Sequence, residues 1–365
     1  AGLLAGRLAA DVPVGMRGVT TAGVGLAFLP LAAWQNALWG FQSQVYFVLI
    51  FSLLAFFWLG LDRPKPAQLV MGLTAGLAAI FSMGPGELVP FALLGLAIMR
   101  AIEKRQLTDL GRRGMWPIVL LSAIVLAVMP WQRTSPQNCS PAQFLSALNL
   151  ALSWPHVDQP WAAVVLNVPL LWAVISRLLR RRRAGTGEDL IILMGGWALL
   201  NAVAIAWARG GDEEFGASWL PSRYIDLLIL LPLANAWLAV MLLTTAAERW
   251  RRSARLLVAA WMVFLLIGWL GTSLQTWHDI LQLRIRDRFA PVRLAQKFYA
   301  TGDPRTYLGQ PRLNTPHPRL DLVWHVLHDP RLQGALPPSF QPKQPLGPLS
   351  GAVRPLLEWP VFPGR

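Results

Sequence analysis

Polar side chains that could take part in chemistry gather in a few short segments between long apolar stretches. The first segment, residues 34–44, is rich in amide and indole groups and carries no charge. An amide both donates and accepts hydrogen bonds, and an indole face can cover the C–H face of a sugar ring. This segment predicts five substrate-binding residues: Trp34, Asn36, Trp39, Gln42 and Gln44. The alternative is an interfacial hairpin whose amide groups cap the ends of helices.

A single acidic residue stands in the short segment 84–87. Glu87 is the only acid between Asp62 and Glu103, and apolar stretches flank it on both sides. An ionisable group beside a bilayer is a functional candidate, because burying its charge is costly. The alternative is a carboxylate that lies in water at the start of a helix, where the helix dipole favours a negative charge.

Two arginines flank the acidic segment 212–214. Arg209 precedes it, and Arg223 follows it, next to Tyr224 and Asp226. Two guanidinium groups can clamp a phosphate or pyrophosphate through paired hydrogen bonds. The sequence therefore predicts that Arg209, Arg223 and Tyr224 bind a substrate and that Asp226 orients one arginine. The alternative is that these arginines only neutralise nearby carboxylates.

Metal and cofactor chemistry finds little support in the sequence. Cys139 is the single cysteine, which excludes an intrachain disulfide and a cysteine-based zinc site. His325 and His328 are three residues apart, but no third ligand has metal-site spacing. We predict no metal site and no cofactor, although a divalent metal stays open.

The elements that position these side chains are predicted to be membrane spans. Hydrophobic residues make up 54% of the chain and charged residues 14%, against about 25% charged in soluble proteins. A spanning helix needs about 20 mostly apolar residues. Nine stretches are expected to form spans: 19–34, 43–61, 68–83, 85–100, 116–131, 161–178, 190–208, 224–246 and 256–274.

Basic residues alternate strictly along the connections between these spans. The connections 62–67, 100–115, 177–189 and 247–255 hold 16 Lys and Arg residues, and the intervening connections hold three. This positive-inside pattern places the N-terminus in the cytoplasm and residues 132–160 and the C-terminus outside. In a soluble protein the net charge of +14 would suggest a nucleic-acid partner. Here we attribute the charge to the positive-inside pattern of the connections. We therefore expect a lipid bilayer and no nucleic acid as partner.

Seven tryptophans fall near the predicted external ends, where indole rings commonly form an interfacial belt. They are Trp34, Trp39, Trp131, Trp154, Trp161, Trp207 and Trp219.

The fold class expected is all-α: a polytopic helical membrane bundle of about nine spans with a small external extension. The domains expected are a multi-span transmembrane domain, 1–274, and an external C-terminal region, 275–365. The second region holds 14 of the 29 prolines, with helices predicted at 276–300 and near 318–334. The chain starts at Ala1 without Met, so we expect a further section upstream.

Three short motifs resemble bacterial polytopic proteins of the GT-C glycosyltransferase type. They are Asn-Ala-Leu-Trp-Gly-Phe-Gln-Ser-Gln at 36–44, Ser-Arg-Tyr-Ile-Asp at 222–226, and the tail segments 327–332 and 336–340. Two departures stand out: Gln35 replaces an acid that usually precedes the Asn, and no matching catalytic external loop is present. The resemblance therefore implies a catalytic acid upstream of Ala1, with Glu87 as the candidate within the chain.

The resemblance implies an inverting enzyme of the bacterial cytoplasmic membrane. Such an enzyme takes a sugar from a polyprenyl-phosphate carrier and attaches it to a glycan, lipid or protein acceptor on the external face. A transporter or flippase of a lipid-linked or small solute is one alternative, and a non-catalytic scaffold is another. Transporters place ionisable residues at mid-membrane, whereas charges within the predicted spans are nearly absent here.

Overall fold

The computed structural model describes most of the chain between residues 43 and 301. The described residues are 6, 18, 43–62, 64–104, 112–128, 139–156, 159–180, 185–211, 220–245, 248–282, 285, 289–301, 306, 329, 331, 338 and 341. Within them the secondary structure is helical, without strands. The chain divides into two compact units, Ala1–Leu274 and Gln275–Arg365. That the second unit is external stays a prediction.

The helices follow the apolar stretches of the sequence. In the first unit they are α4 (Ser43–Leu59), α5 (Pro66–Ser82), η4 (Gly84–Leu88), α6 (Val89–Lys104), α7 (Arg112–Val128), α8 (Pro141–Ser153), α9 (Ala162–Arg180), α10 (Thr186–Arg209), η7 (Ser222–Tyr224), α12 (Ile225–Leu228), α13 (Leu230–Thr245), η8 (Glu248–Trp250) and α14 (Arg251–Thr276). After α14 come a π-helical turn, η9 (Trp277–Leu281), and α16 (Ala290–Thr301).

Five of the described helical segments are long and apolar enough to cross a membrane, and three shorter apolar helices accompany them. The five are Gly84–Glu103, Ala162–Leu179, Gly187–Arg209, Ser222–Leu243 and Glu248–Thr276; the shorter ones are Ser43–Leu59, Pro66–Ser82 and Met115–Val128. The protein is therefore an all-helical, multi-pass membrane protein. The span expected at 19–34 lies outside the described residues, so the count of nine stays a prediction.

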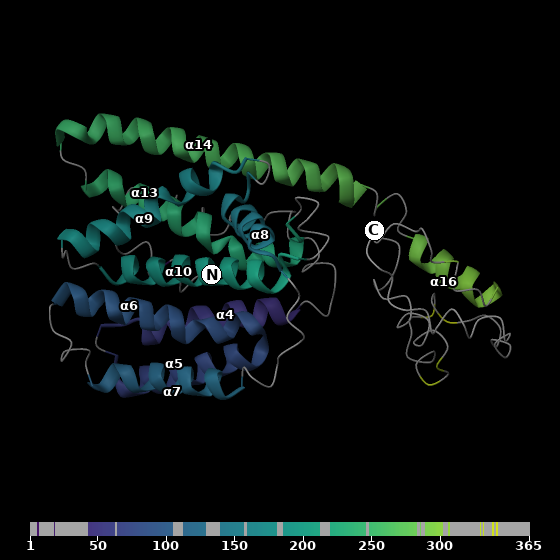
Figure 1. The fold of residues 1–365 in the computed structure, drawn as a ribbon, viewed down its shortest axis with the longest axis horizontal. Coiled ribbons are helices and arrows are strands. Elements are labelled where there is room, and N and C mark those ends of the chain that lie inside the picture. Colours follow the sequence, from purple (N-terminus) through teal and green to yellow (C-terminus); the bar gives the residue numbers. More distant parts are fainter. Residues whose placement is uncertain are drawn as a thin grey trace. The chain divides into compact units, whose positions relative to one another are not determined.

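The helices of the first unit lie side by side, so the bundle has two ends (Figure 1). At one end α6 and α9 finish and α10 and α14 begin. The described arginines Arg100, Arg177 and Arg252 lie toward this end, and we call it the basic end. At the other end, the far end, α4 begins and η4 connects α5 to α6.

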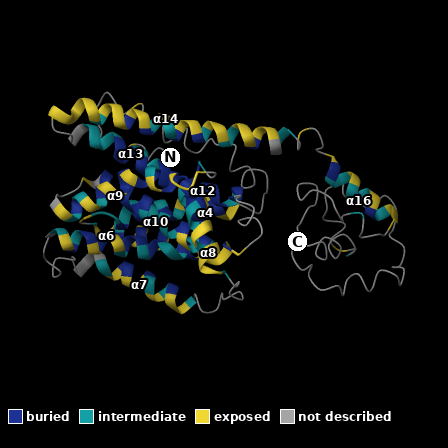
Figure 2. Cartoon of the chain, turned by 45° about the horizontal axis from the view of Figure 1, so that its top comes forward, coloured by how far each residue is buried: buried dark blue, intermediate teal, exposed yellow. Residues whose placement is uncertain are grey.

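The core of the bundle is built around α10. Trp197 of α10 is fully buried and meets Phe56 of α4 edge to face, with ring centroids 6.1 Å apart. Small residues bring α4 and α5 close together: a Cβ atom at Gly72 would lie 2.7 Å from the Leu59 Cδ2 atom. Close approach through small residues is how helices associate in lipid, where apolar burial gives little drive. In contrast, α14 presents a mostly exposed apolar surface (Figure 2).

Proline opens the backbone of α9, and side chains of other helices fill the gap. Pro169 lacks an N–H, so it cannot donate to the carbonyl of Val165 one turn earlier. The indole Nε1 of Trp261 in α14 donates to that carbonyl at 2.9 Å. Next to the proline, the Leu170 amide donates to Asn235 Oδ1 of α13 at 2.9 Å.

The same region holds a pair of buried amides. Asn235 Nδ2 donates to Asn167 Oδ1 at 3.2 Å and to the Leu231 carbonyl at 2.9 Å. Asn167 is 6% exposed and Asn235 is 0% exposed. A second proline, Pro232, removes another backbone donor, and the helix is interrupted at Ile229, between α12 and α13. These hydrogen bonds satisfy polar groups that lipid cannot.

The connection 132–160 contains a helix that the sequence analysis did not assign. Ser140 caps α8 by accepting from the Gln143 amide at 3.3 Å, and Pro141 occupies the first helical position. Ala147, Leu150 and Ala151 on this helix are buried, and α8 contacts both α9 and α10. This connection therefore belongs in part to the packed bundle.

Candidate functional site

The elements that carry three of the polar segments pack against one another at the far end. Helix α10 contacts α4, η4 and α12, and α4 contacts η4 and α12. The most direct link joins α4 to α12: the Tyr46 side chain lies within interaction distance of the Asp226 carboxylate. Tyr46 lies two residues after the first polar segment, and Asp226 closes the Ser-Arg-Tyr-Ile-Asp motif. We call the segments 43–46, 84–88 and 222–226 together the far-end site.

Asp226 lies inside this site and not on its surface. Its residue is 4% exposed, in the first turn of the short helix α12. Ser222 and Tyr224 beside it are also buried. A buried carboxylate needs hydrogen-bond donors, and the nearby Tyr46 hydroxyl can serve as one. That Asp226 also orients an arginine stays a prediction.

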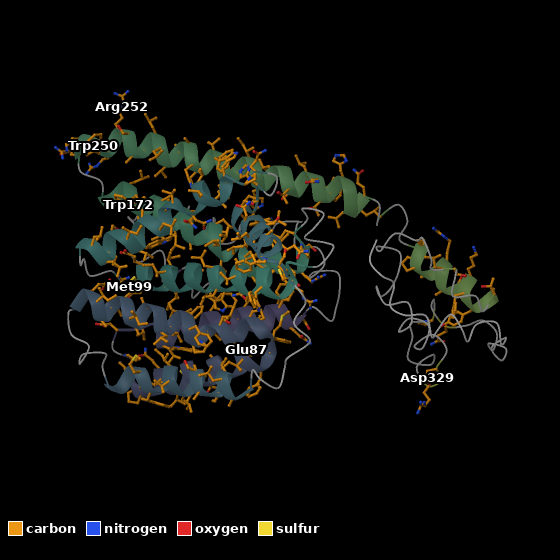
Figure 3. All side chains as sticks on the ribbon, in the orientation of Figure 1. Glu87, Met99, Trp172, Trp250, Arg252 and Asp329 are labelled. Carbon is orange, nitrogen blue, oxygen red and sulfur yellow. The ribbon has the colours of Figure 1, made fainter. Side chains whose placement is uncertain are left out.

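Glu87 stands in the turn η4, which is held firmly on both sides. The carbonyl of Pro85 accepts a hydrogen bond from Trp197 Nε1 at 3.0 Å. Gly86 packs directly on the backbone of α5, where a Cβ atom would lie 2.8 Å from the Ile80 nitrogen. Glu87 itself is half-buried, and its Oε1 atom is buried without a hydrogen-bond partner among the described residues. Figure 3 shows Glu87 away from the basic end, where Met99, Trp250 and Arg252 lie.

The two arginines differ in their surroundings. Arg223 is half-buried, with its guanidinium carbon 5.0 Å from the ring centroid of Tyr224, a cation–π distance. Arg209 is exposed in the last turn of α10. Their predicted acidic neighbours at 212–214 lie outside the described residues. The structure thus places both arginines at helix ends beside the loop 210–221.

The remaining predicted site residues are mostly beyond the described part of the chain. Trp34, Asn36, Trp39 and Gln42 lie outside it, and Gln44 is exposed in the first turn of α4. Among the described residues no group of three His, Cys, Asp or Glu side chains could hold a metal ion. The roles of these residues stay predictions.

Sequence reasoning missed two features. Tyr46 was not singled out, although its place two residues after Gln44 was a usable signal. The second concerns the basic connections: Arg100 and Arg177 were counted as loop residues, but they lie within α6 and α9. Their side chains are only 15% and 2% exposed, and both are ion-paired to Asp189. Apolar flanks alone do not reveal that charged residues near helix ends meet inside a bundle.

Comparison with protein-family models, curated proteins and solved structures finds no match to the chain.

Proposed function

We propose that the far-end site transfers a sugar from a polyprenyl-phosphate carrier to an acceptor hydroxyl on the external face of a bacterial cytoplasmic membrane. The observation that carries the proposal is the contact between α4 and α12, which brings Tyr46, two residues after the first polar segment, to Asp226 of the third. This contact supports one site built from segments that lie about 180 residues apart in sequence. The motif resemblance supports the choice of reaction, and the nine-span topology with an external tail belongs to the same proposal.

The proposed chemistry assigns a role to each kind of side chain. A carboxylate takes the proton of the acceptor hydroxyl, whose oxygen bonds to the anomeric carbon of the sugar. The bond between that carbon and the phosphate oxygen breaks, and the lipid phosphate leaves. Arg209 and Arg223 stabilise the leaving phosphate, because preorganised cations act where charge develops. Glu87 is the proposed base within this chain, unless an acid upstream of Ala1 serves instead.

The test measures binding of a polyprenyl-phosphate analogue to the purified protein in nanodiscs. A charge-assisted contact contributes about 1.5–3 kcal/mol, so Arg223→Ala should weaken binding by about 10- to 100-fold. Arg223→Lys should also weaken it, because lysine keeps the charge but loses the planar fork. The matched control is Arg252→Ala, an exposed arginine at the basic end. Equal affinity of the wild type and Arg223→Ala would refute the phosphate-binding role.

Glu87→Gln separates binding from chemistry. It keeps the shape of the side chain and removes the charge, so the analogue should still bind. Release of polyprenyl phosphate from a sugar-loaded carrier should fall by 100-fold or more, in the range expected for a general base, about 10²- to 10⁴-fold. Unchanged release would show that Glu87 is not the base.

One observation favours the transporter alternative. Helices α9 and α13 both contain proline, and buried amides link them at Asn167 and Asn235. Interrupted helices within the membrane are typical of transporter binding sites, and the helix formed by α12 and α13 is interrupted at Ile229. Uptake of a solute into vesicles with no sugar release, lost in Asn235→Leu, would support this alternative over the enzyme.

A further inference from the structure

Four charged side chains meet inside the bundle at its basic end. They belong to three helices: Arg100 and Glu103 to α6, Arg177 to α9 and Asp189 to α10. Their side chains are 15%, 5%, 2% and 7% exposed. Two positive and two negative charges make the group electrically neutral. We call these four residues the ionic seal.

Arg177 forms the centre of the ionic seal. Its Nε atom pairs with Glu103 Oε1, and its Nη2 atom donates to Glu103 Oε2 at 3.2 Å. Its Nη1 atom lies 2.6 Å from Asp189 Oδ1. The forked contact with Glu103 is the pairing that a planar guanidinium favours, whereas the contact with Asp189 is an ion pair without a hydrogen bond. Together they join α9 to α6 and α10.

Arg100 extends the ionic seal to a fourth helix. Its Nε atom donates to Asp189 Oδ2 at 3.2 Å, and its Nη2 atom pairs with the same oxygen. Nη2 also donates to the Gly60 carbonyl at 2.7 Å, and Nη1 to the Leu61 carbonyl at 3.3 Å. These carbonyls follow the last turn of α4, where backbone acceptors have no partner within the helix. The Arg100 side chain therefore satisfies two carbonyls at the end of α4 and also pairs with Asp189 of α10.

We infer that the ionic seal keeps the basic end of the bundle closed. Separating α6, α9 and α10 at this end would leave charges without partners in a poorly hydrated space, which is strongly unfavourable. The inference concerns access alone and does not depend on sugar transfer.

Cysteine labelling in nanodiscs tests the seal, because both ends then face buffer. The reporter is Ala173→Cys in a Cys139→Ala background: Ala173 is 8% exposed and lies one turn before Arg177 in α9. A charged maleimide should label it at least 100-fold more slowly than Ser253→Cys, an exposed position at the start of α14. Labelling of Ala173→Cys as fast as Ser253→Cys would show an end that opens, and the inference would fail.

Isosteric variants then ask whether the charges, and not the packing, exclude the reagent. Glu103→Gln should speed labelling at Ala173→Cys by about tenfold, and Asp189→Asn by more, because Asp189 pairs with both arginines. No acceleration in either variant would overturn the inference.

The native cysteine controls for global loosening. Cys139 lies next to the last turn of α10 at the far end, with its sulfur 3.9 Å from the Ala206 carbonyl. In the chain that keeps Cys139 and Ala173, Asp189→Asn should leave the labelling rate of Cys139 unchanged. A parallel rise at Cys139 would show that the whole bundle loosens, which also counts against a local seal.

Discussion

The hydrogen bond from the Trp261 indole should contribute more to the free energy of unfolding when residue 169 is proline than when it is alanine. Trp261 Nε1 supplies the donor that Pro169 withholds from the Val165 carbonyl. Trp261→Phe removes this donor and leaves a buried acceptor unpaired, which costs about 1–3 kcal/mol. Interhelical hydrogen bonds in membrane proteins average about 0.6 kcal/mol and reach about 1.7 kcal/mol. We therefore expect a specific effect of about 1 kcal/mol, added to the lost packing of a side chain that is 9% exposed.

Pro169→Ala isolates that specific effect. Alanine restores a backbone N–H that reaches the Val165 carbonyl, so the substitution should rescue Trp261→Phe. In a double-mutant cycle the packing loss and the helix propensity of alanine cancel. What remains is the coupling free energy between two donors, the Trp261 indole and the amide of residue 169, that bind the same Val165 carbonyl.

The assay is reversible unfolding by SDS in mixed micelles, followed by circular dichroism. Pro169→Ala should raise the free energy of unfolding more in the Trp261→Phe background than in the wild type, by about 1 kcal/mol. Additivity within about 0.3–0.5 kcal/mol, the usual result for independent sites, would refute the reasoning. It would mean that the Val165 carbonyl does not need the indole when the proline is present.

Three further changes test the packing of the bundle and of the tail. Gly268→Leu should weaken the docking of α14 by about 1–3 kcal/mol in the same unfolding assay, because even a Cβ atom there would lie 2.6 Å from His156 Cδ2. Asn167→Leu and Asn235→Leu should show a coupling of about 0.6–1.7 kcal/mol, since one amide donates to the other; additive effects would contradict the bond. Burial raises the pKa of Tyr299 in α16 above its ordinary value of 10.0, so the stability of that region is present below pH 10 and is lost as the pH rises through the folded-state value. Absorbance at 295 nm should show a late-titrating tyrosine component that is lost in Tyr299→Phe.

The sequence predicted the helices well because a membrane span leaves a long, uniform apolar signal. Eight of the nine expected stretches coincide with described helices or helical segments, although their ends shift by several residues. The first stretch, 19–34, lies outside the described residues. A short, capped helix such as α8 escaped notice because its 13 residues resemble any polar connection.

Tryptophan illustrates what apolar periodicity does not resolve. Seven tryptophans near span ends were expected to lie at the membrane interface. Trp161 and Trp207 are 54% and 72% exposed, as an interfacial belt requires, but Trp154 is 3% exposed. The burial of Trp154 follows from the packing of α8 and the loop after it. That packing depends on contacts with α14, about 110 residues later in the chain, which no local pattern contains.

The candidate site could be predicted only in pieces. Residue chemistry identified Glu87, Arg223 and Asp226 separately, since each breaks the apolar pattern around it. Their gathering at one end depends on how α4, η4, α10 and α12 pack. The partnership of Tyr46 with Asp226 joins residues 180 positions apart, and it became visible only in three dimensions.

The polar anchors of α14 have a consequence for how the protein assembles. Lipid chains solvate the exposed apolar face of α14 as well as a neighbouring helix would, so this helix can enter the bilayer alone. Three polar contacts then fix its position: Trp261 with the Val165 carbonyl, His156 with the Phe264 carbonyl, and Thr272 with the Pro155 carbonyl. All three partners lie in α9 or in the loop before it. The polar partners that set the register of α14 are thus already synthesised when the last span emerges, and apolar contacts with α9 and α13 complete its docking.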